Sequence, residues 1–138
     1  MPNKIISIFL IIFSLIIFNA NSDDQINFDV SEIQILDEGN KIIGKDRGTI
    51  TTNSGIVIDA DEFEFNKVKN ILKAKGNIII KDKINNYDFK ANDILYDKNN
   101  EKIEITGKSE AFIDQNYEFK TDDITILRKE MIISSEKG

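Results

Sequence analysis

The stretch DADEFEFNK, residues 59–67, has a counterpart about thirty residues later in KANDILYDK, residues 90–98. It begins a third time as KTDDITI, residues 120–126, and a weaker first copy starts at Val30. Each copy joins a small residue and a polar pair to a hydrophobic alternation. The equivalent small residues are Ala60, Ala91 and Thr121, at offsets of 31 and 30. A fixed period near thirty indicates stacked supersecondary units.

Within each unit the apolar residues recur at every second position, which predicts strands. The alternation changes phase once per unit, because Tyr87 and Phe89 have one parity whereas Ile94 and Tyr96 have the other. Such a slip would turn every later side chain to the wrong face of a regular strand. We therefore expect a bulge or corner at each polar pair, where the strand bends and keeps its apolar face inward. The pairs are Asp61-Glu62, Asn92-Asp93 and Asp122-Asp123.

The remaining punctuation also fits a coil of hairpins. Asp97–Lys102 (DKNNEK) and its counterpart at residues 66–70 predict polar hairpin loops. Residues 83–86 and 113–116 end the next strands, and Gly76 lies inside strand-like sequence, as does its equivalent thirty-one residues later. A glycine at such a position indicates a sharp bend or a close backbone approach. The whole pattern predicts an all-β fold with an elongated apolar interior, two open ends and an unpaired final edge.

Composition excludes several classes of function. The chain has 138 residues, no cysteine, no histidine and a net charge of −6. Thiol nucleophiles, imidazole bases and the common zinc sites are therefore absent from the sequence. An acidic chain also lacks the basic face of a general nucleic-acid binder. We expect neither an enzyme nor a cofactor-dependent or metal-binding protein, and we interpret the recurrent acidic pairs as solvated corner residues because no calcium-loop spacing accompanies them.

The first 22 residues have the layout of a secretory signal peptide. Lys4 precedes an apolar run, Ile5–Phe18, and Ala20 and Ser22 occupy the positions that a signal peptidase reads. An uncleaved N-terminal anchor is the alternative, although the run is shorter than the ~20 residues of a membrane span. Cleavage would leave residues 23–138 as one exported domain.

The segment at residues 58–80, IDADEFEFNKVKNILKAKGNIII, resembles the repeat of the OstA-like domains of lipopolysaccharide transport. In that pattern an Ala-Asp pair precedes an apolar alternation and an A-x-G-N segment follows; here these are Ala60-Asp61 and Ala74–Asn77. The resemblance covers roughly residues 28–138. The family includes the periplasmic bridge LptA, the N-terminal periplasmic domain of LptD and the anchored LptC.

The resemblance implies an open, twisted β-jellyroll that shelters lipid A acyl chains in an apolar groove and stacks edge to edge with related domains, or with itself, in the periplasm. An association with the outer membrane is also implied. The candidate groove residues are apolar residues of the repeat and its flanks. They are Ile56, Ile58, Phe63, Phe65, Leu72, Ile78, Ile80, Phe89, Ile94, Tyr96, Ile103, Ile105 and Phe119.

Two other readings stay open at this point. The chain fits a ligand-free structural or adhesive β-solenoid, in which all thirteen residues only pack the core. Residues 28–45, FDVSEIQILDEGNKIIGK, look more like the start of the LptD periplasmic domain. On that reading the chain is an LptD N-terminal domain without its barrel.

Overall fold

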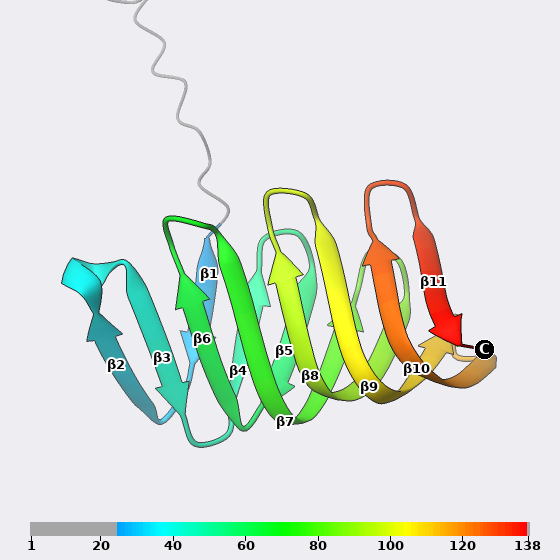
Figure 1. Cartoon of the computed structure of the whole chain (residues 1–138), viewed down its shortest axis with the longest axis horizontal. Helices are drawn as coiled ribbons and strands as arrows, with labels where there is room; N and C mark the ends of the chain where they lie inside the picture. The colour runs from blue at the N-terminus through cyan, green and yellow to red at the C-terminus, as the bar shows by residue number, and fades with distance from the viewer. Residues whose placement is uncertain (1–24, 138) are drawn as a thin grey trace, which may run out of the picture.

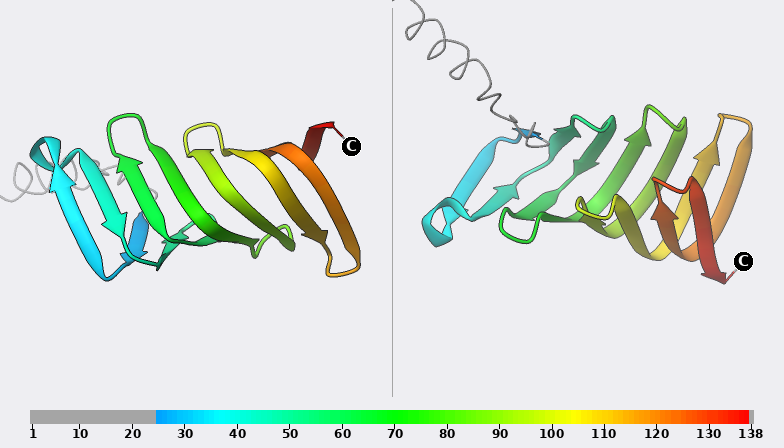
Figure 2. Two further views of the ribbon diagram at one scale, coloured as in Figure 1. Left: turned by 60° about the horizontal axis from the view of Figure 1, so that its bottom comes forward. Right: turned by 90° about the horizontal axis from the view of Figure 1, so that it is seen from above.

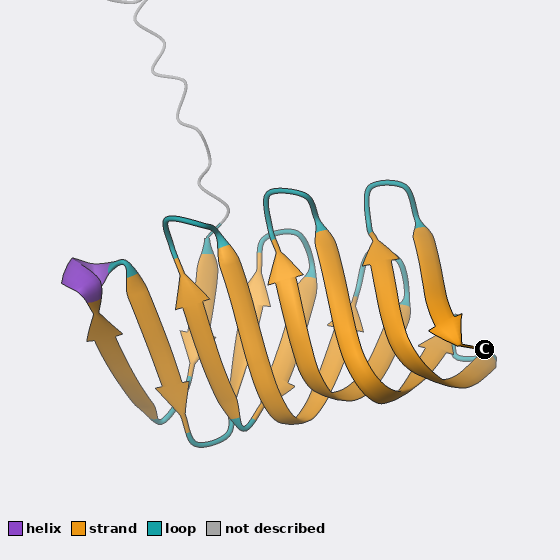
Figure 3. Ribbon diagram, viewed as in Figure 1, coloured by secondary structure: helices purple, strands orange, loops and turns teal. Residues whose placement is uncertain are grey.

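The computed structural model describes residues 25–137, and the proposed signal segment lies outside them. These residues form eleven antiparallel strands in one continuous, folded sheet, with a single 3₁₀ turn at Asp37–Gly39 (Figures 1 and 3). The strands are β1 (Ile26–Asp29), β2 (Glu32–Leu36), β3 (Lys41–Lys45), β4 (Gly48–Thr52), β5 (Ile56–Ala60), β6 (Glu62–Asn66), β7 (Ile71–Asp82), β8 (Tyr87–Asp97), β9 (Lys102–Ile113), β10 (Tyr117–Leu127) and β11 (Ile132–Lys137).

The sheet is folded into two layers that share one bent side. The first halves of β7 and β9 and the second halves of β8 and β10 lie in one layer with β2, β3, β6 and β11. Their other halves lie in the second layer with β1, β4 and β5. Figure 1 shows the four long strands curving from layer to layer along the lower side, whereas hairpins line the upper side; Figure 2 shows the two layers from other directions. The predicted open, twisted jellyroll is confirmed.

The bend in each long strand coincides with a β-bulge. The pairing register shifts between Lys90 and Asp93 in β8 and between Asp122 and Ile124 in β10, at the two polar pairs where the phase of the sequence changes. In the copy at residues 59–67 the chain leaves strand geometry at Asp61, between β5 and β6. The corners predicted from the sequence are therefore confirmed, and each bulge lets a continuous strand keep its apolar face inward.

Strands β7 and β9 bend at the same corner through residues with positive φ. Gly76 has a φ of 77° inside β7, and Gly107 has a φ of 81° inside β9. The register of β7 also shifts between Lys75 and Ile78. Left-handed backbone is accessible to glycine without steric cost, which explains why glycine stands inside strand-like sequence here.

Residues that are paired across neighbouring strands form rows, and the inward-facing rows make up the core. In the β1 layer one inward row runs from Phe28 through Ile58 and Phe89 to Phe119, and the facing layer has a row through Phe65 and its equivalents. Nineteen apolar residues in these and adjacent rows are buried in one cluster. At both ends the rows continue onto exposed side chains, because no further strand covers them within residues 25–137. These side chains include Ile33, Ile35, Tyr117 and Phe119.

The two corner glycines differ in what surrounds them, which gives a paired test. An added Cβ at Gly76 would lie 2.6 Å from the Asp61 carboxylate, whereas one at Gly107 would meet nothing within 4 Å. We expect Gly107→Ala to cost about 1 kcal/mol of unfolding free energy through backbone strain alone. Gly76→Ala should cost about 2–3 kcal/mol, because it also displaces a carboxylate that accepts hydrogen bonds from Asn77 and Arg47. Urea unfolding measures both, and equal costs would contradict the steric argument.

Candidate functional site

Twelve of the thirteen predicted groove residues meet in the buried core. They come from β5 to β9, and all belong to one cluster in which side chains of the two layers contact each other. They are Ile56, Ile58, Phe63, Phe65, Leu72, Ile78, Ile80, Phe89, Ile94, Tyr96, Ile103 and Ile105. Along this stretch the interior is therefore filled by the protein's own side chains. Contact of these residues with lipid stays a prediction.

Phe119 is the thirteenth residue, and it lies apart from the buried cluster. It continues the register row of Phe89 and Ala111 on β10, but its side chain is 52% exposed. The difference arises because β11 pairs with β10 only from Asp122 to Leu127, so Tyr117 to Lys120 have no second paired strand among the described residues. Phe119 thus belongs to the end of the sheet and not to its middle.

A cavity of about 720 Å³ opens between the layers near β1. Its apolar lining comes from Ile26 and Phe28 of one layer and from Ile42 and Phe65 of the other. The Phe28 and Phe65 rings have centroids 6.0 Å apart, so this pair joins the two layers at the cavity. Ligand sites in proteins commonly have volumes of ~300–1,000 Å³, which places this cavity in the range of a binding site.

The rim of this cavity is polar, and none of its lining residues in the described part of the chain is a carboxylate. Lys67 and Asn70, in the hairpin between β6 and β7, line it together with Asn99, in the hairpin between β8 and β9. The Asn70 amide donates to Asn99 Oδ1 at 2.9 Å, and Asn99 donates to the Lys69 carbonyl at 3.2 Å. The two hairpin tips are therefore held side by side at the mouth of the cavity.

A larger hollow, of about 940 Å³, lies on the bent side of the fold. Its charged side chains are largely paired with one another: Arg47 binds Asp61 at 3.0 Å, while Glu110 lies 3.4 Å from Lys90 and 3.2 Å from Lys120. A hollow with mutually neutralised charges offers little net attraction to an ion. The interlayer cavity is the stronger candidate for a binding site.

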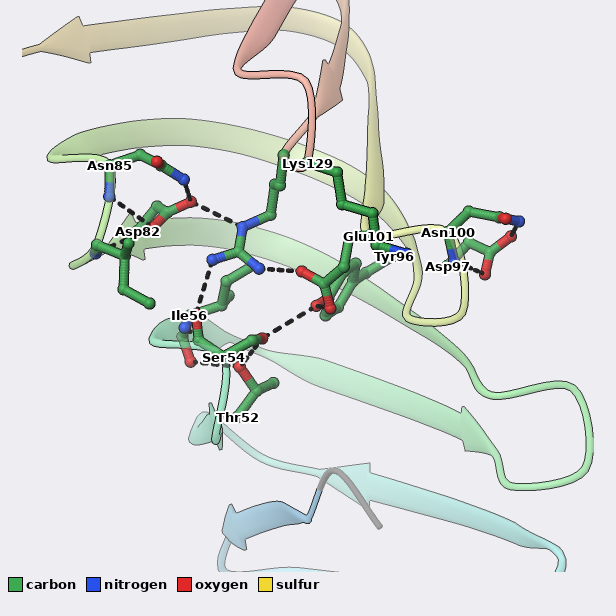
Figure 4. Close-up of polar contacts among 12 residues, drawn as sticks. Thr52, Ser54, Ile56, Asp82, Asn85, Tyr96, Asp97, Asn100, Glu101 and Lys129 are labelled. Atoms are coloured by element: carbon green, nitrogen blue, oxygen red, sulfur yellow. Dashed lines mark hydrogen bonds and ion pairs between the residues drawn. The ribbon is translucent and has the colours of Figure 1, made fainter. Parts of the chain in front are cut away.

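Elsewhere on the hairpin side, five largely buried polar residues form a network that we call the mouth cluster. They are Ser54, Asp82, Tyr96, Glu101 and Arg128. Arg128 follows β10 in one layer and reaches Asp82 at the end of β7 in the other. Its Nε donates to Asp82 Oδ2 at 2.7 Å, and its Nη2 donates to the Ser54 carbonyl at 2.7 Å. Its Nη1 also pairs with Glu101. In Figure 4, dashed lines join oxygen atoms of Asp82, Glu101 and Ser54 to the nitrogen atoms of one guanidinium group.

The remaining partners of the mouth cluster complete the network. Tyr96 donates to Glu101 Oε1 at 2.8 Å and lies 3.3 Å from the Ser54 hydroxyl. Asp82 also accepts the Asn85 amide at 2.8 Å. Every buried side-chain nitrogen and oxygen in residues 25–137 has a hydrogen-bond partner. A buried ion pair is tolerated when its lone pairs and protons are satisfied in this way.

The electrostatics of the mouth cluster favour its charged state. Burial raises the pKa of Asp82, but the hydrogen bonds from Arg128 and Asn85 outweigh it, so the pKa lies below its ordinary value of 3.8. Burial lowers the pKa of Arg128, and the bond to Asp82 reverses this, so the net pKa is raised. Burial also raises the pKa of the Tyr96 hydroxyl, which stays protonated. The ion pair is therefore fully charged at neutral pH.

Sequence reasoning named Phe65 and Tyr96 but missed the other parts of both sites. Arg128 stands two residues after Ile126, as Lys98 follows Tyr96 and Lys67 follows Phe65, so the repeat contained a signal for a basic residue at the end of each unit. The cavity residues Phe28 and Ile42 stand thirty residues before Ile58 and Leu72, so the repeat period contained a signal for them as well. No group of three or more potential metal ligands occurs within residues 25–137.

Comparison with known proteins places the fold. No protein-family model matches the sequence, and no curated protein matches it. A solved structure does match: LptH from Pseudomonas aeruginosa, described as the LptA homologous periplasmic component of the conserved lipopolysaccharide transport device. The TM-score is 0.74 at 11% sequence identity, over 84% of this chain and 85% of that chain. The chain shares this fold. Separately, none of the helical segments described is long and apolar enough to cross a membrane.

The mouth cluster predicts that the cost of breaking its ion pair depends on pH. The depressed pKa of Asp82 contributes stability above pH 3.8 that begins to be lost as the pH falls below that value. In Arg128→Met the carboxylate is buried without its cation, so its pKa should rise and the variant should lose less on acidification. We expect a cost of about 3 kcal/mol at pH 7 that shrinks toward pH 3. Urea unfolding across this range measures the difference.

A matched control removes an exposed ion pair. Lys102 lies 2.7 Å from Glu104, and both side chains are at least 35% exposed. Lys102→Met should cost less than about 1 kcal/mol at pH 7. A mouth-cluster variant that behaved like this control would show that the cluster does not hold the layers together.

Proposed function

We propose that the protein binds lipopolysaccharide in the periplasm, shelters its acyl chains between the two layers and passes it toward the outer membrane through stacked, related domains. The carrying observation is the interlayer cavity, which opens to solvent beside the apolar residues Phe28, Ile42 and Phe65, on a fold shared with LptH. LptH is described as a component of a lipopolysaccharide transport device. Residues 1–22 would serve as the export signal.

The energetics of acyl-chain binding need no catalytic group. Burying one methylene gains about 0.8 kcal/mol, so a chain of a dozen carbons gains on the order of 10 kcal/mol before ordering costs. The cavity supplies an apolar start for such a chain at Phe28 and Phe65, and the buried register rows continue from there along the interior. The protein would act as a passive conduit, with the work of transport done elsewhere.

The two ends of the sheet support stacking of domains. Ile33 and Ile35 are exposed at the β2 end, and Tyr117 and Phe119 are exposed at the β10 end. All four extend inward-facing rows of the core. A second domain whose β2 end met this β10 end would bury both sets and continue the interior, in a head-to-tail contact that can propagate.

The packed core favours a second candidate, the ligand-free structural solenoid. Twelve predicted groove residues already fill each other's space, as the core of a solenoid without ligand would. The two candidates differ in whether lipid reaches the interior. A crosslinking experiment separates them.

Photo-crosslinking residues at Phe28, Phe65 and Ile94 of the exported protein should form adducts with added lipopolysaccharide. Phe28 and Phe65 line the cavity, whereas Ile94 lies deeper, so the yield should fall from the first two positions to the third. The control position is Lys73, exposed on the outer face of β7, where no adduct is expected. Denaturing gel electrophoresis with detection of lipopolysaccharide measures the yield. Folded protein without adducts at any of the three positions would favour the ligand-free solenoid.

Charge at the β10 end should weaken association between domains. Phe119→Asp places a carboxylate where an apolar side chain would be buried on stacking, so the dissociation constant should rise roughly tenfold or more. Sedimentation velocity over a concentration series measures this. The control is Ile84→Asp, at an exposed apolar position in a hairpin away from the sheet end. Equal effects of both changes would contradict edge stacking.

A further inference from the structure

The repeat puts a basic residue two positions after the last inward-facing residue of three successive units. These residues are Lys67, Lys98 and Arg128, and all three lie on the hairpin side of the same layer. The structure uses them differently. Arg128 is bound by Asp82 and Glu101 in the mouth cluster, and the Lys98 ammonium lies 6.0 Å from the centroid of the Phe65 ring.

Lys67 is the member of the row that faces the cavity. Its side chain is exposed and lines the cavity mouth, and it has no ion-pair partner within residues 25–137. Among residues 25–137 no carboxylate lines this cavity, although the chain has 24 acidic residues and a net charge of −6. The mouth of this cavity therefore combines an apolar interior with a cation that has no ion-pair partner among the described residues, in a molecule of negative net charge.

The neighbouring rim groups add hydrogen-bonding capacity beside that cation. Asn70 and Asn99 hold the two hairpin tips together through side-chain amides that also line the cavity. Lysine binds phosphate as a compact point charge, and amides donate to the remaining phosphate or sugar oxygens. Below them, Phe28, Ile42 and Phe65 present only carbon atoms of their side chains.

We propose that this cavity is a headgroup site for a phosphorylated, acylated lipid, with a phosphate at the Lys67 ammonium and an acyl chain against Phe28 and Phe65. The inference rests on the proposed lipid-binding function. It adds that Lys67 recognises the phosphate of the ligand at one defined end of the interior. Charge complementarity selects this occupant, because an acidic protein would otherwise repel an anionic lipid. The apolar floor of the cavity lies next to its cationic rim, as the acyl chain lies next to the phosphate in such a lipid.

The test compares two lysines of one hairpin. Lys67→Glu changes the cavity rim. Lys69→Glu changes a lysine two residues further along the hairpin that does not line the cavity, with the same change of net charge. The probes are bis-phosphorylated lipid A and the same lipid without phosphates, each in neutral detergent micelles. Binding to the full exported chain is measured by microscale thermophoresis at 0.15 M salt, and circular dichroism checks that each variant is folded.

The wild type and Lys69→Glu should bind the phosphorylated lipid roughly tenfold more tightly than the dephosphorylated one, and Lys67→Glu should lose this preference. Lys67→Gln should lose most of it, which guards against misfolding of the charge-reversed variant. Equal binding of both lipids by the wild type would overturn the headgroup site and leave the proposed function standing. Binding of neither lipid would overturn both. Retention of the preference by folded Lys67→Glu would also overturn the site.

Discussion

The fold depends on keeping one face of a strand inward while the strand passes from one layer to the other. A regular strand bent through such a corner would carry polar residues into the core, because its side chains alternate strictly. The extra residue at each bulge, as at Asn92-Asp93, restores the phase after the bend. Because of these bulges both layers keep buried rows, and the hairpins all lie on the opposite side of the fold. The small residue before each bulge, such as Ala91, fits where the two layers converge.

Folding a sheet on one bent side leaves the other side open, and the chain deals with that side in two ways. Toward β10 the mouth cluster joins the layers through Arg128 and Asp82, at the cost of desolvating two charges. Toward β1 the layers meet at the Phe28–Phe65 contact, and the space above it is a cavity. The same repeat position supplies Arg128 in the closed part and Lys67 in the open part. What differs is the opposing layer, which provides Asp82 in one place and the short strand β1 in the other.

The repeat made most of the fold predictable. Periodicity located the strands, hairpins and corners from residue 56 onward, because each unit repeats the same apolar and polar positions. The sequence pattern also found the buried rows, since alternation reports which face is inward. It grouped Phe119 with twelve residues that are buried, whereas the Phe119 side chain is 52% exposed. Exposure there depends on which strand lies next to β10, and periodicity carries no information about neighbouring strands. The mouth cluster was missed for a related reason: Asp82 and Arg128 are 46 residues apart and meet only once the layers face each other.

A close-packed interior and a conduit for lipid are compatible if the lipid displaces side chains as it enters. The gain from transferring an acyl chain, on the order of 10 kcal/mol, is then offset by the loss of contacts among buried side chains and by the ordering of the chain. Such a balance gives weak binding per domain, and a carrier that must release its ligand to the next domain needs weak binding. On this argument the open cavity near Phe28 sets where a lipid enters, while the mouth cluster restrains how far the layers separate. The packed core would then tune the affinity of the proposed conduit and need not argue against it.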